Sequence, residues 1–124
     1  MKSILIVEDE WNLRLLYSQE FKSEGYEVVA VSDGPSAREQ VRQRRFDLAI
    51  VDVKLDGESG LDVLREIMSE DRQLRVILNS AYSSFMSDFT SWSADAYLVK
   101  SSDLSELKSK VKELTAPASF VAMA

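Results

Sequence analysis

Acidic side chains follow two short apolar stretches of the sequence. Residues 4–7 (ILIV) run directly into Glu8 and Asp9, and residues 48–51 (LAIV) run directly into Asp52. Such runs are typical of buried strands in a parallel sheet, whose ligand site lies beyond the carboxyl ends of the strands. Three carboxylates gathered there would repel one another unless a cation lay among them. The sequence therefore predicts a site for a hard cation with oxygen ligands, with Mg²⁺ as the first choice.

Two further apolar runs end in polar groups that such a site could use. Residues 76–78 (VIL) lead through Asn79 to the hydroxyl of Ser80, and residues 96–99 (AYLV) end at Lys100. Together the strand ends offer a metal pocket, a carboxylate nucleophile, a hydroxyl donor and a fixed cation. These are the parts needed to transfer a phosphoryl group to a carboxylate.

From Lys2 to about Leu114 the sequence resembles the receiver domain of two-component response regulators. The resemblance is carried by four segments at the expected strand ends: residues 4–10 (ILIVEDE), 52–61 (DVKLDGESGL), 79–81 (NSA) and 97–100 (YLVK). It implies phosphorylation of Asp52 by a histidine kinase or a histidine phosphotransfer protein, with small phosphorylated molecules as possible substitutes. Because the chain contains no histidine, it cannot itself carry the phosphohistidine.

The resemblance also implies the metal ligands. Asp9, Asp52 and the backbone carbonyl of Lys54 would hold Mg²⁺. Glu8 would act through water, because its longer side chain stands where the family more often has Asp. A capping role for Glu8 and Asp9 at the first helix remains an alternative, and both roles can coexist.

A catalytic and a switching role follow from the same resemblance. Asp52 would attack phosphorus in line while Lys100 and Ser80 hold the equatorial oxygens. The new charge would draw the Ser80 hydroxyl inward and open space for Tyr97 to turn, so that Ser80 and Tyr97 form a switch. Partners would read the face formed by the fourth helix (segment 82–95), the fifth strand (96–99) and the fifth helix (104–114). Without the resemblance, Tyr97 would be read as a half-buried strand aromatic.

Two other function classes compete with this interpretation. A phosphatase of the haloacid dehalogenase type also has an aspartate nucleophile after a strand, but it needs a second acid two positions on, where this chain has Lys54. A degenerate receiver would act as a phosphorylation-independent protein-interaction module. Against it, Glu8, Asp9, Asp52, Ser80 and Lys100 are all chemically competent.

Alternating strand and helix patterns indicate how the site is assembled. Strands are expected at 4–7, 27–31, 48–52, 76–80 and 96–99, and helices at 11–24, 35–44, about 61–68 and 104–114. This order predicts an α/β fold, a doubly wound five-stranded parallel sheet with helices on both faces, which is the flavodoxin-like receiver fold. Residues 1–114 would form the receiver domain and 115–124 a tail or linker stub.

Some local patterns make sharper predictions. In the first helix, Leu13, Leu16, Tyr17 and Phe21 share helical spacing, which predicts a buried face that ends at a Gly25 cap. Segment 82–95 has weak helix propensity, and its aromatic residues Phe85, Phe89 and Trp92 are either core or an exposed partner surface.

Three further expectations concern the site and the last helix. Asp103 and Glu106 resemble a capping box. The Lys100–Ser101 peptide, where many receivers have proline, is expected to be cis so that Lys100 can point at Asp52. Lys54 and Tyr82 lack a carboxylate or amide to orient water, which predicts slow self-dephosphorylation.

Composition limits the remaining possibilities. A net charge of −6 without a basic stripe argues against direct nucleic-acid binding, and no apolar run approaches a membrane span. The absence of histidine excludes a Ser-His-Asp apparatus, and the absence of cysteine excludes thiol chemistry. With no signal-peptide pattern at the start, a cytoplasmic location is expected. The output would be a downstream protein target or a fused output domain, and a homodimer is possible.

Overall fold

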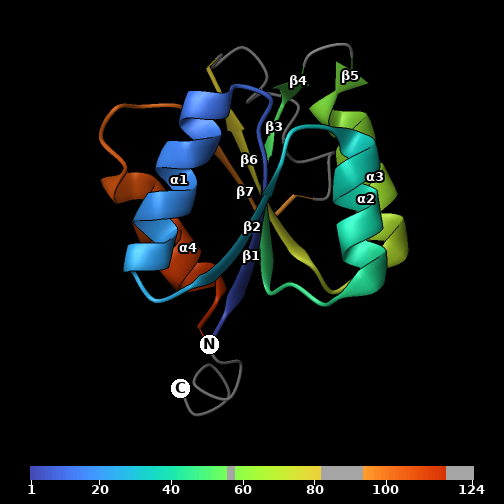
Figure 1. The fold of residues 1–124 in the computed structure, drawn as a ribbon, viewed down its shortest axis with the longest axis horizontal. Coiled ribbons are helices and arrows are strands. Elements are labelled where there is room, and N and C mark those ends of the chain that lie inside the picture. The colour runs from blue at the N-terminus through green and yellow to red at the C-terminus, as the bar shows by residue number, and fades with distance from the viewer. Residues whose placement is uncertain (56–57, 82–93, 117–124) are drawn as a thin grey trace.

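The computed structural model describes residues 1–55, 58–81 and 94–116, and it has the predicted doubly wound α/β architecture (Figure 1). Five parallel strands form the central sheet in the order β2-β1-β3-β6-β7. Its strands are β1 (Ser3–Val7), β2 (Glu27–Val31), β3 (Leu48–Asp52), β6 (Arg75–Ser80) and β7 (Ala96–Val99). The order changes direction between β1 and β3, and a ligand crevice is expected at such a point.

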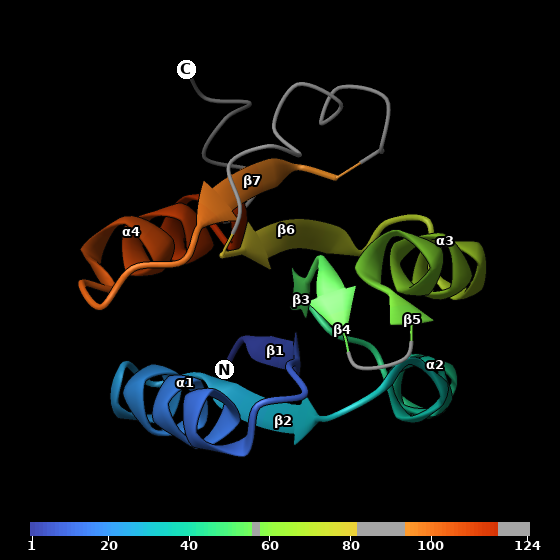
Figure 2. The same cartoon turned by 90° about the horizontal axis from the view of Figure 1, so that it is seen from above.

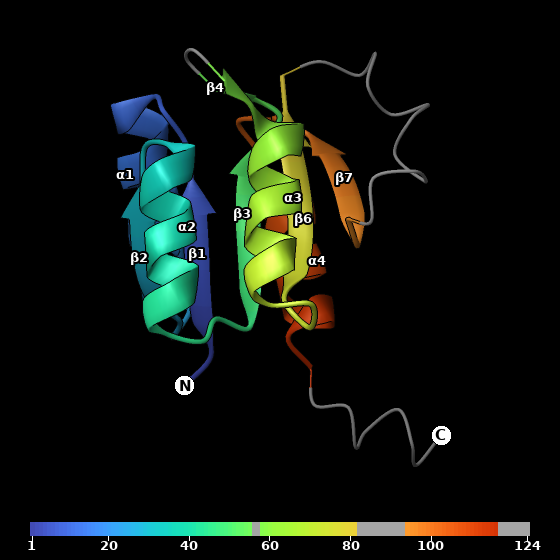
Figure 3. The same cartoon turned by 90° about the vertical axis from the view of Figure 1, so that its right-hand side faces the viewer.

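Helices cover both faces of the sheet, as Figure 2 shows from above. On one face lie α1 (Trp11–Ser23) and α4 (Ser105–Leu114), and on the other lie α2 (Gly34–Gln43) and α3 (Gly60–Glu70) (Figure 3). Successive strand side chains point to opposite faces, which divides the core in two. Ile4, Ile6, Ile50 and Ile77 pack toward α1 and α4, whereas the strand positions between them pack toward α2 and α3.

Helix α1 matches most of its sequence pattern. Tyr17 and Phe21 are buried, and Gly25 ends the segment with φ 93°, a left-handed conformation that glycine adopts without a steric penalty. The prediction for Leu16 was wrong, because this side chain is 40% exposed. A helical stripe in the sequence is wider than the strip of helix surface that the sheet covers, so its edge positions remain in solvent.

Two connections differ from the sequence prediction. Between β3 and α3, where the sequence predicts no strand, the chain forms a two-stranded antiparallel ribbon, β4 (Lys54–Leu55) with β5 (Glu58–Ser59). The capping box at α4 is also absent. Asp103 accepts hydrogen bonds from the Ser105 backbone and hydroxyl. The Asp103 backbone N–H, from which a capping-box Glu106 would accept, donates instead to Ser101 Oγ at 3.1 Å.

Candidate active site

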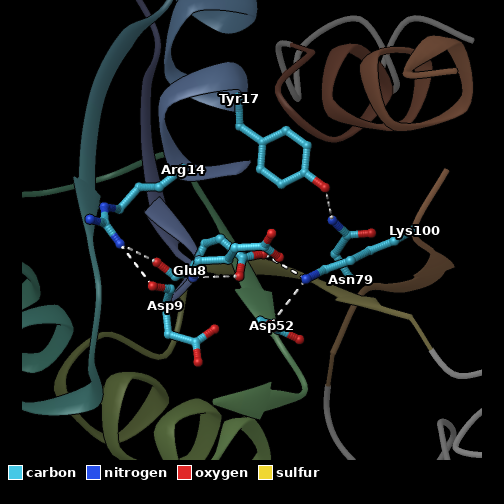
Figure 4. A network of polar contacts seen from close by, with 8 residues as sticks. Glu8, Asp9, Arg14, Tyr17, Asp52, Asn79 and Lys100 are labelled. Atoms are coloured by element: carbon cyan, nitrogen blue, oxygen red, sulfur yellow. Dashed lines mark hydrogen bonds and ion pairs between the residues drawn. The ribbon is translucent and has the colours of Figure 1, made fainter. Parts of the chain in front are cut away.

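Three carboxylates meet at the carboxyl ends of β1 and β3. One oxygen from each of Glu8, Asp9 and Asp52 lies within 4.8 Å of the others (Figure 4). Glu8 and Asp52 are buried, whereas Asp9 is partly exposed. The two strands run in parallel register, with Val7 opposite Val51, and this register brings the acids together. A cluster of carboxylate oxygens at this spacing has the donor chemistry that Mg²⁺ requires.

Lys100, which follows the edge strand β7, forms ion pairs with two of these acids. Its Nζ lies 2.7 Å from Glu8 Oε1 and 3.1 Å from Asp52 Oδ2. The described residues contain no cis peptide, so the Lys100–Ser101 bond is trans and the expectation of a cis bond was wrong. The side chain has enough length to reach Asp52 from a trans backbone.

Burial and charge act in opposite directions on Glu8. Loss of hydration raises the pKa of its carboxyl to about 7, although the hydrogen bond and charge of Lys100 both lower it. Burial also acts to lower the pKa of Lys100, but its contacts with Glu8 and Asp52 outweigh burial, and the pKa of the ammonium is raised. The lysine therefore remains a fixed positive charge in the pocket.

The acidic loop is held by groups that the sequence analysis did not identify. The Arg14 guanidinium donates from Nη1 to the backbone oxygens of Glu8 at 2.8 Å and Asp9 at 3.3 Å. Glu8 Oε2 accepts from the Glu10 backbone N–H at 3.2 Å, which is part of the capping role considered from the sequence. No sequence pattern marks Arg14, because its acceptors are backbone carbonyls, which every residue has.

A glycine permits the close packing behind Asp52. A Cβ at Gly60 would lie 2.0 Å from the Asp52 carbonyl oxygen and 2.7 Å from the Val53 Cα. The Gly60 backbone also donates to the Val53 carbonyl at 2.7 Å. The beginning of α3 therefore rests directly on the strand end that carries Asp52, and only glycine allows this approach.

Ser80 lies at the end of β6 and is fully buried. Its carbonyl accepts from the Lys100 backbone N–H at 2.6 Å, so the hydroxyl and the ammonium come from adjoining strand ends. Tyr97 is buried rather than half-buried, and it packs with the core on the α2 and α3 side.

Two predicted contributions are only partly covered by the described structure. Lys54 begins β4, two residues after Asp52, but its side chain lies outside the described part. Tyr82 and the aromatic residues of segment 82–93 also lie outside it. The expected slow self-dephosphorylation and the partner surface on that segment therefore stay predictions.

The profile of one protein family, the response regulator receiver domain, matches residues 4–112. The chain belongs to this family. Sporulation initiation phosphotransferase F of Bacillus subtilis (strain 168) is 30% identical over 114 residues, which cover 90% of this chain and 92% of that protein. The response regulator PhoP of Pseudomonas aeruginosa is 32% identical over 113 residues, but the chain spans only 50% of PhoP.

Solved receiver structures support the same assignment. The regulator TrrA of Thermotoga maritima, in complex with Mg²⁺-BeF, is 44% identical with a TM-score of 0.86 over 92% of this chain and 99% of that one. A complex of TrrA with the histidine kinase ThkA gives 43% identity and a TM-score of 0.85 over 94% of this chain and 100% of that one. This receiver domain is thus homologous to phosphorylated regulators, and its acidic pocket is consistent with a phosphoaspartate site.

Among the described residues, no helix is both long enough and apolar enough to cross a bilayer.

Proposed function

We propose that this receiver domain accepts a phosphoryl group on Asp52 from a phosphohistidine in another protein, in a reaction that depends on Mg²⁺. The observation that carries the proposal is the position of the Lys100 ammonium, 3.1 Å from Asp52 and 2.7 Å from Glu8, beside a cluster of three carboxylates. A fixed cation next to a buried carboxylate is suited to hold the charge of a transferring phosphoryl group.

The transfer is a single displacement at phosphorus. An Asp52 carboxylate oxygen forms the new O–P bond as the P–N bond to the donor imidazole breaks. The imidazole, which solvent has protonated on its other ring nitrogen, departs as a neutral ring. With acetyl phosphate, the P–O bond breaks instead and acetate leaves. Lys100 and the Ser80 hydroxyl hold the phosphoryl oxygens in both cases.

Asp9, Asp52 and the carbonyl of Lys54 would hold the metal, with Glu8 acting through water. When bound, Mg²⁺ supplies positive charge that offsets the repulsion between the carboxylates and the incoming phosphate. The structure of TrrA with Mg²⁺-BeF supports this assignment, because that regulator is 44% identical to this chain.

The product would signal through a change in shape. Contact of Ser80 with the phosphoryl group and a turn of Tyr97 would reshape the face that includes β7 and α4. A histidine kinase or histidine phosphotransfer protein is the proposed donor, which the complex of TrrA with ThkA supports. A separate target protein or a fused output domain would read the altered face.

Acetyl phosphate and intact-protein mass spectrometry test the proposal directly. In the presence of Mg²⁺, the wild-type protein should gain the mass of one phosphoryl group, and Asp52→Asn should gain none. Asp47→Asn is the matched control, because Asp47 lies at the opposite end of β3 and accepts a hydrogen bond from the Ser3 backbone. It should be labelled normally.

Two outcomes would contradict the proposal. Undiminished labelling of Asp52→Asn would move the acceptor to another residue. No labelling of the wild-type protein, together with no binding of beryllofluoride, would favour the phosphorylation-independent interaction module.

A further inference from the structure

A buried polar pair lies beside the active site and takes no part in the chemistry described above. The Asn79 side-chain amide on β6 donates a hydrogen bond to the Tyr17 hydroxyl on α1 at 3.2 Å (Figure 4). Tyr17 is 2% exposed and Asn79 is 3% exposed. Tyr17 belongs to the apolar core cluster that also contains Ile77 and Leu98. The pair therefore joins α1 to β6 through a buried polar contact.

The strand register places Asn79 on the strand that the Lys100 side chain crosses to reach Asp52. Asn79 is opposite Asp52 on β3 and opposite Leu98 on β7. Neighbouring strands are about 4.8 Å apart, and β6 lies between β7 and β3. Lys100 must cross β6 to bring its Nζ to 3.1 Å from Asp52. In Figure 4 the Asn79 amide points toward the Tyr17 hydroxyl on α1, and the Lys100 ammonium points toward Glu8 and Asp52.

The same pair also borders a small cavity. Tyr17 and Asn79 line this space of about 120 Å³ together with apolar side chains and with Ser101, Asp103 and Glu106. The cavity thus offers two carboxyl groups close in sequence to Lys100. If the pair were loosened, the ammonium could turn toward these carboxylates instead of Asp52.

The charges of the active site also act on the Tyr17 hydroxyl. Burial is the main cause of the raised pKa of Tyr17. The hydrogen bond from Asn79 and the charge of Lys100 lower this pKa, whereas the charges of Glu8 and Asp52 raise it. The tyrosine hydroxyl is therefore close enough to sense the charges in the active site.

We propose that Tyr17 and Asn79 are positioning residues for phosphoryl transfer, because their hydrogen bond keeps the Lys100 ammonium over Asp52 and fixes the strand end that carries Ser80. The proposal rests on the phosphoryl transfer to Asp52 proposed above. The pair acts through Lys100 and Ser80 and does not touch the phosphoryl group. It should leave the metal ligands undisturbed, because Glu8, Asp9 and Asp52 come from β1 and β3.

Tyr17→Phe removes the hydroxyl and keeps the ring. We expect the maximal rate of phosphorylation by acetyl phosphate, at saturating Mg²⁺, to fall roughly threefold to tenfold, since misplacing a positioned group slows transfer without removing its chemistry. The Kd for Mg²⁺ should stay within about twofold of wild type, because its ligands are unchanged. Asn79→Ser, whose side chain is too short to reach Tyr17, should reproduce this split between rate and affinity.

The Lys100 side-chain resonances supply a readout that does not depend on phosphorylation. In the phosphate-free protein, the chemical shifts of the Lys100 ε-methylene group should move in Tyr17→Phe, because the ammonium changes its carboxylate partners. This measurement separates the two proposals. If wild-type protein is not phosphorylated but the lysine resonances move as expected, the proposed function and the role of the pair in transfer both fail, and only the placement of Lys100 by the pair stands.

Tyr26→Phe is the matched control for loss of a tyrosine hydroxyl. Tyr26 contacts Thr115 through its hydroxyl at 3.4 Å, near the other end of the sheet. It should change neither the phosphorylation rate nor the Lys100 resonances. The positioning role is overturned if Tyr17→Phe keeps wild-type rates and resonances, or if Tyr26→Phe changes both to the same degree.

Discussion

The charge of Glu8 depends strongly on its surroundings. The carboxyl is 2% exposed, and burial raises its pKa to about 7 despite the ion pair with Lys100. Below that pH the metal-free pocket holds a neutral Glu8, while Lys100 can still pair with Asp52. In the metal-free protein, the cost in folding free energy that burial of the Glu8 carboxyl imposes therefore increases toward neutral pH.

A pH dependence of stability follows from the raised pKa of Glu8. The folded carboxyl binds a proton up to about pH 7, whereas the unfolded one releases it near 4.5. The folded state thus binds more protons between these values, and the contribution of Glu8 to the free energy of unfolding must fall as pH rises through this window. Glu8→Gln removes the titration, so the variant should gain stability relative to wild type from pH 5 to 8, by about 3 kcal/mol at most.

Urea unfolding in EDTA at several pH values measures this difference. A gap between the variant and wild type that shrinks as pH rises would show that the ion pair with Lys100 outweighs the effect of burial.

Among the elements, α3 constrains the site by its closeness to β3. Gly60→Ala would place a Cβ 2.0 Å from the Asp52 carbonyl oxygen, and the nearest atoms are all backbone. The helix must then move away from the strand end, so we expect a loss of about 2 kcal/mol or more in the free energy of unfolding. Phosphorylation by acetyl phosphate should also slow, because Asp52 loses its support.

Gly25→Ala provides the comparison for this glycine variant. Gly25 has φ 93°, but a Cβ there would meet no atom within 4 Å. The cost should be about 1 kcal/mol from backbone strain alone, with normal phosphorylation. If Gly60→Ala is as stable and as active as wild type, α3 does not hold Asp52 in place.

Helix α1 presents apolar side chains to solvent directly after the acidic residues of the site. Trp11 is 66% exposed and Leu15 is 47% exposed, and their spacing places them on one face of the helix. An exposed tryptophan beside a reaction site is typical of a protein contact surface. A donor protein must approach this edge of the sheet to reach Asp52.

Trp11→Ala should therefore separate two kinds of phosphoryl donor. Transfer from a histidine kinase should slow about tenfold or more, whereas labelling by acetyl phosphate should be unchanged. The measurement uses whichever purified kinase phosphorylates the wild-type protein most rapidly in a panel. Equal rates from both donors in the variant and the wild type would exclude this face from donor docking.

At the scale of the whole molecule, the site exists only in the assembled sheet. Its charged groups come from β1, β3 and the residue after β7, and the unfolded chain does not bring them together. A ligand that binds only the folded state stabilises it according to its free concentration. Bound Mg²⁺ would also lessen the repulsion among the three carboxylates.

We expect Mg²⁺ to raise the melting temperature of the wild-type protein, and EDTA to reverse the change. At a concentration one hundred times the Kd, the added stability would be about 2.7 kcal/mol. Asp9→Asn should reduce the increase, and sodium chloride at equal ionic strength should not reproduce it. Equal stabilisation by both salts would indicate general screening instead of a metal site.

The sequence alone determined the elements and the chemistry of the strand ends. Apolar runs that end in Glu8, Asp52, Ser80 and Lys100 identify buried parallel strands, because the alternation of strands with helical patterns leaves few other arrangements. The carboxyl ends of those strands must meet at one edge of the sheet. This local information was sufficient for the fold, and it is the basis on which the residues of the candidate site are proposed.

Only the tertiary structure decided how that site is supported. The contacts of Arg14 with backbone oxygens, the approach of Gly60 to Asp52 and the bond between Tyr17 and Asn79 join groups that have no characteristic spacing. The trans peptide after Lys100 belongs with them, because the reach of a side chain depends on where its strand lies in the sheet. Such contacts depend on register and on the distance between layers, which packing of the whole chain sets and no short segment encodes.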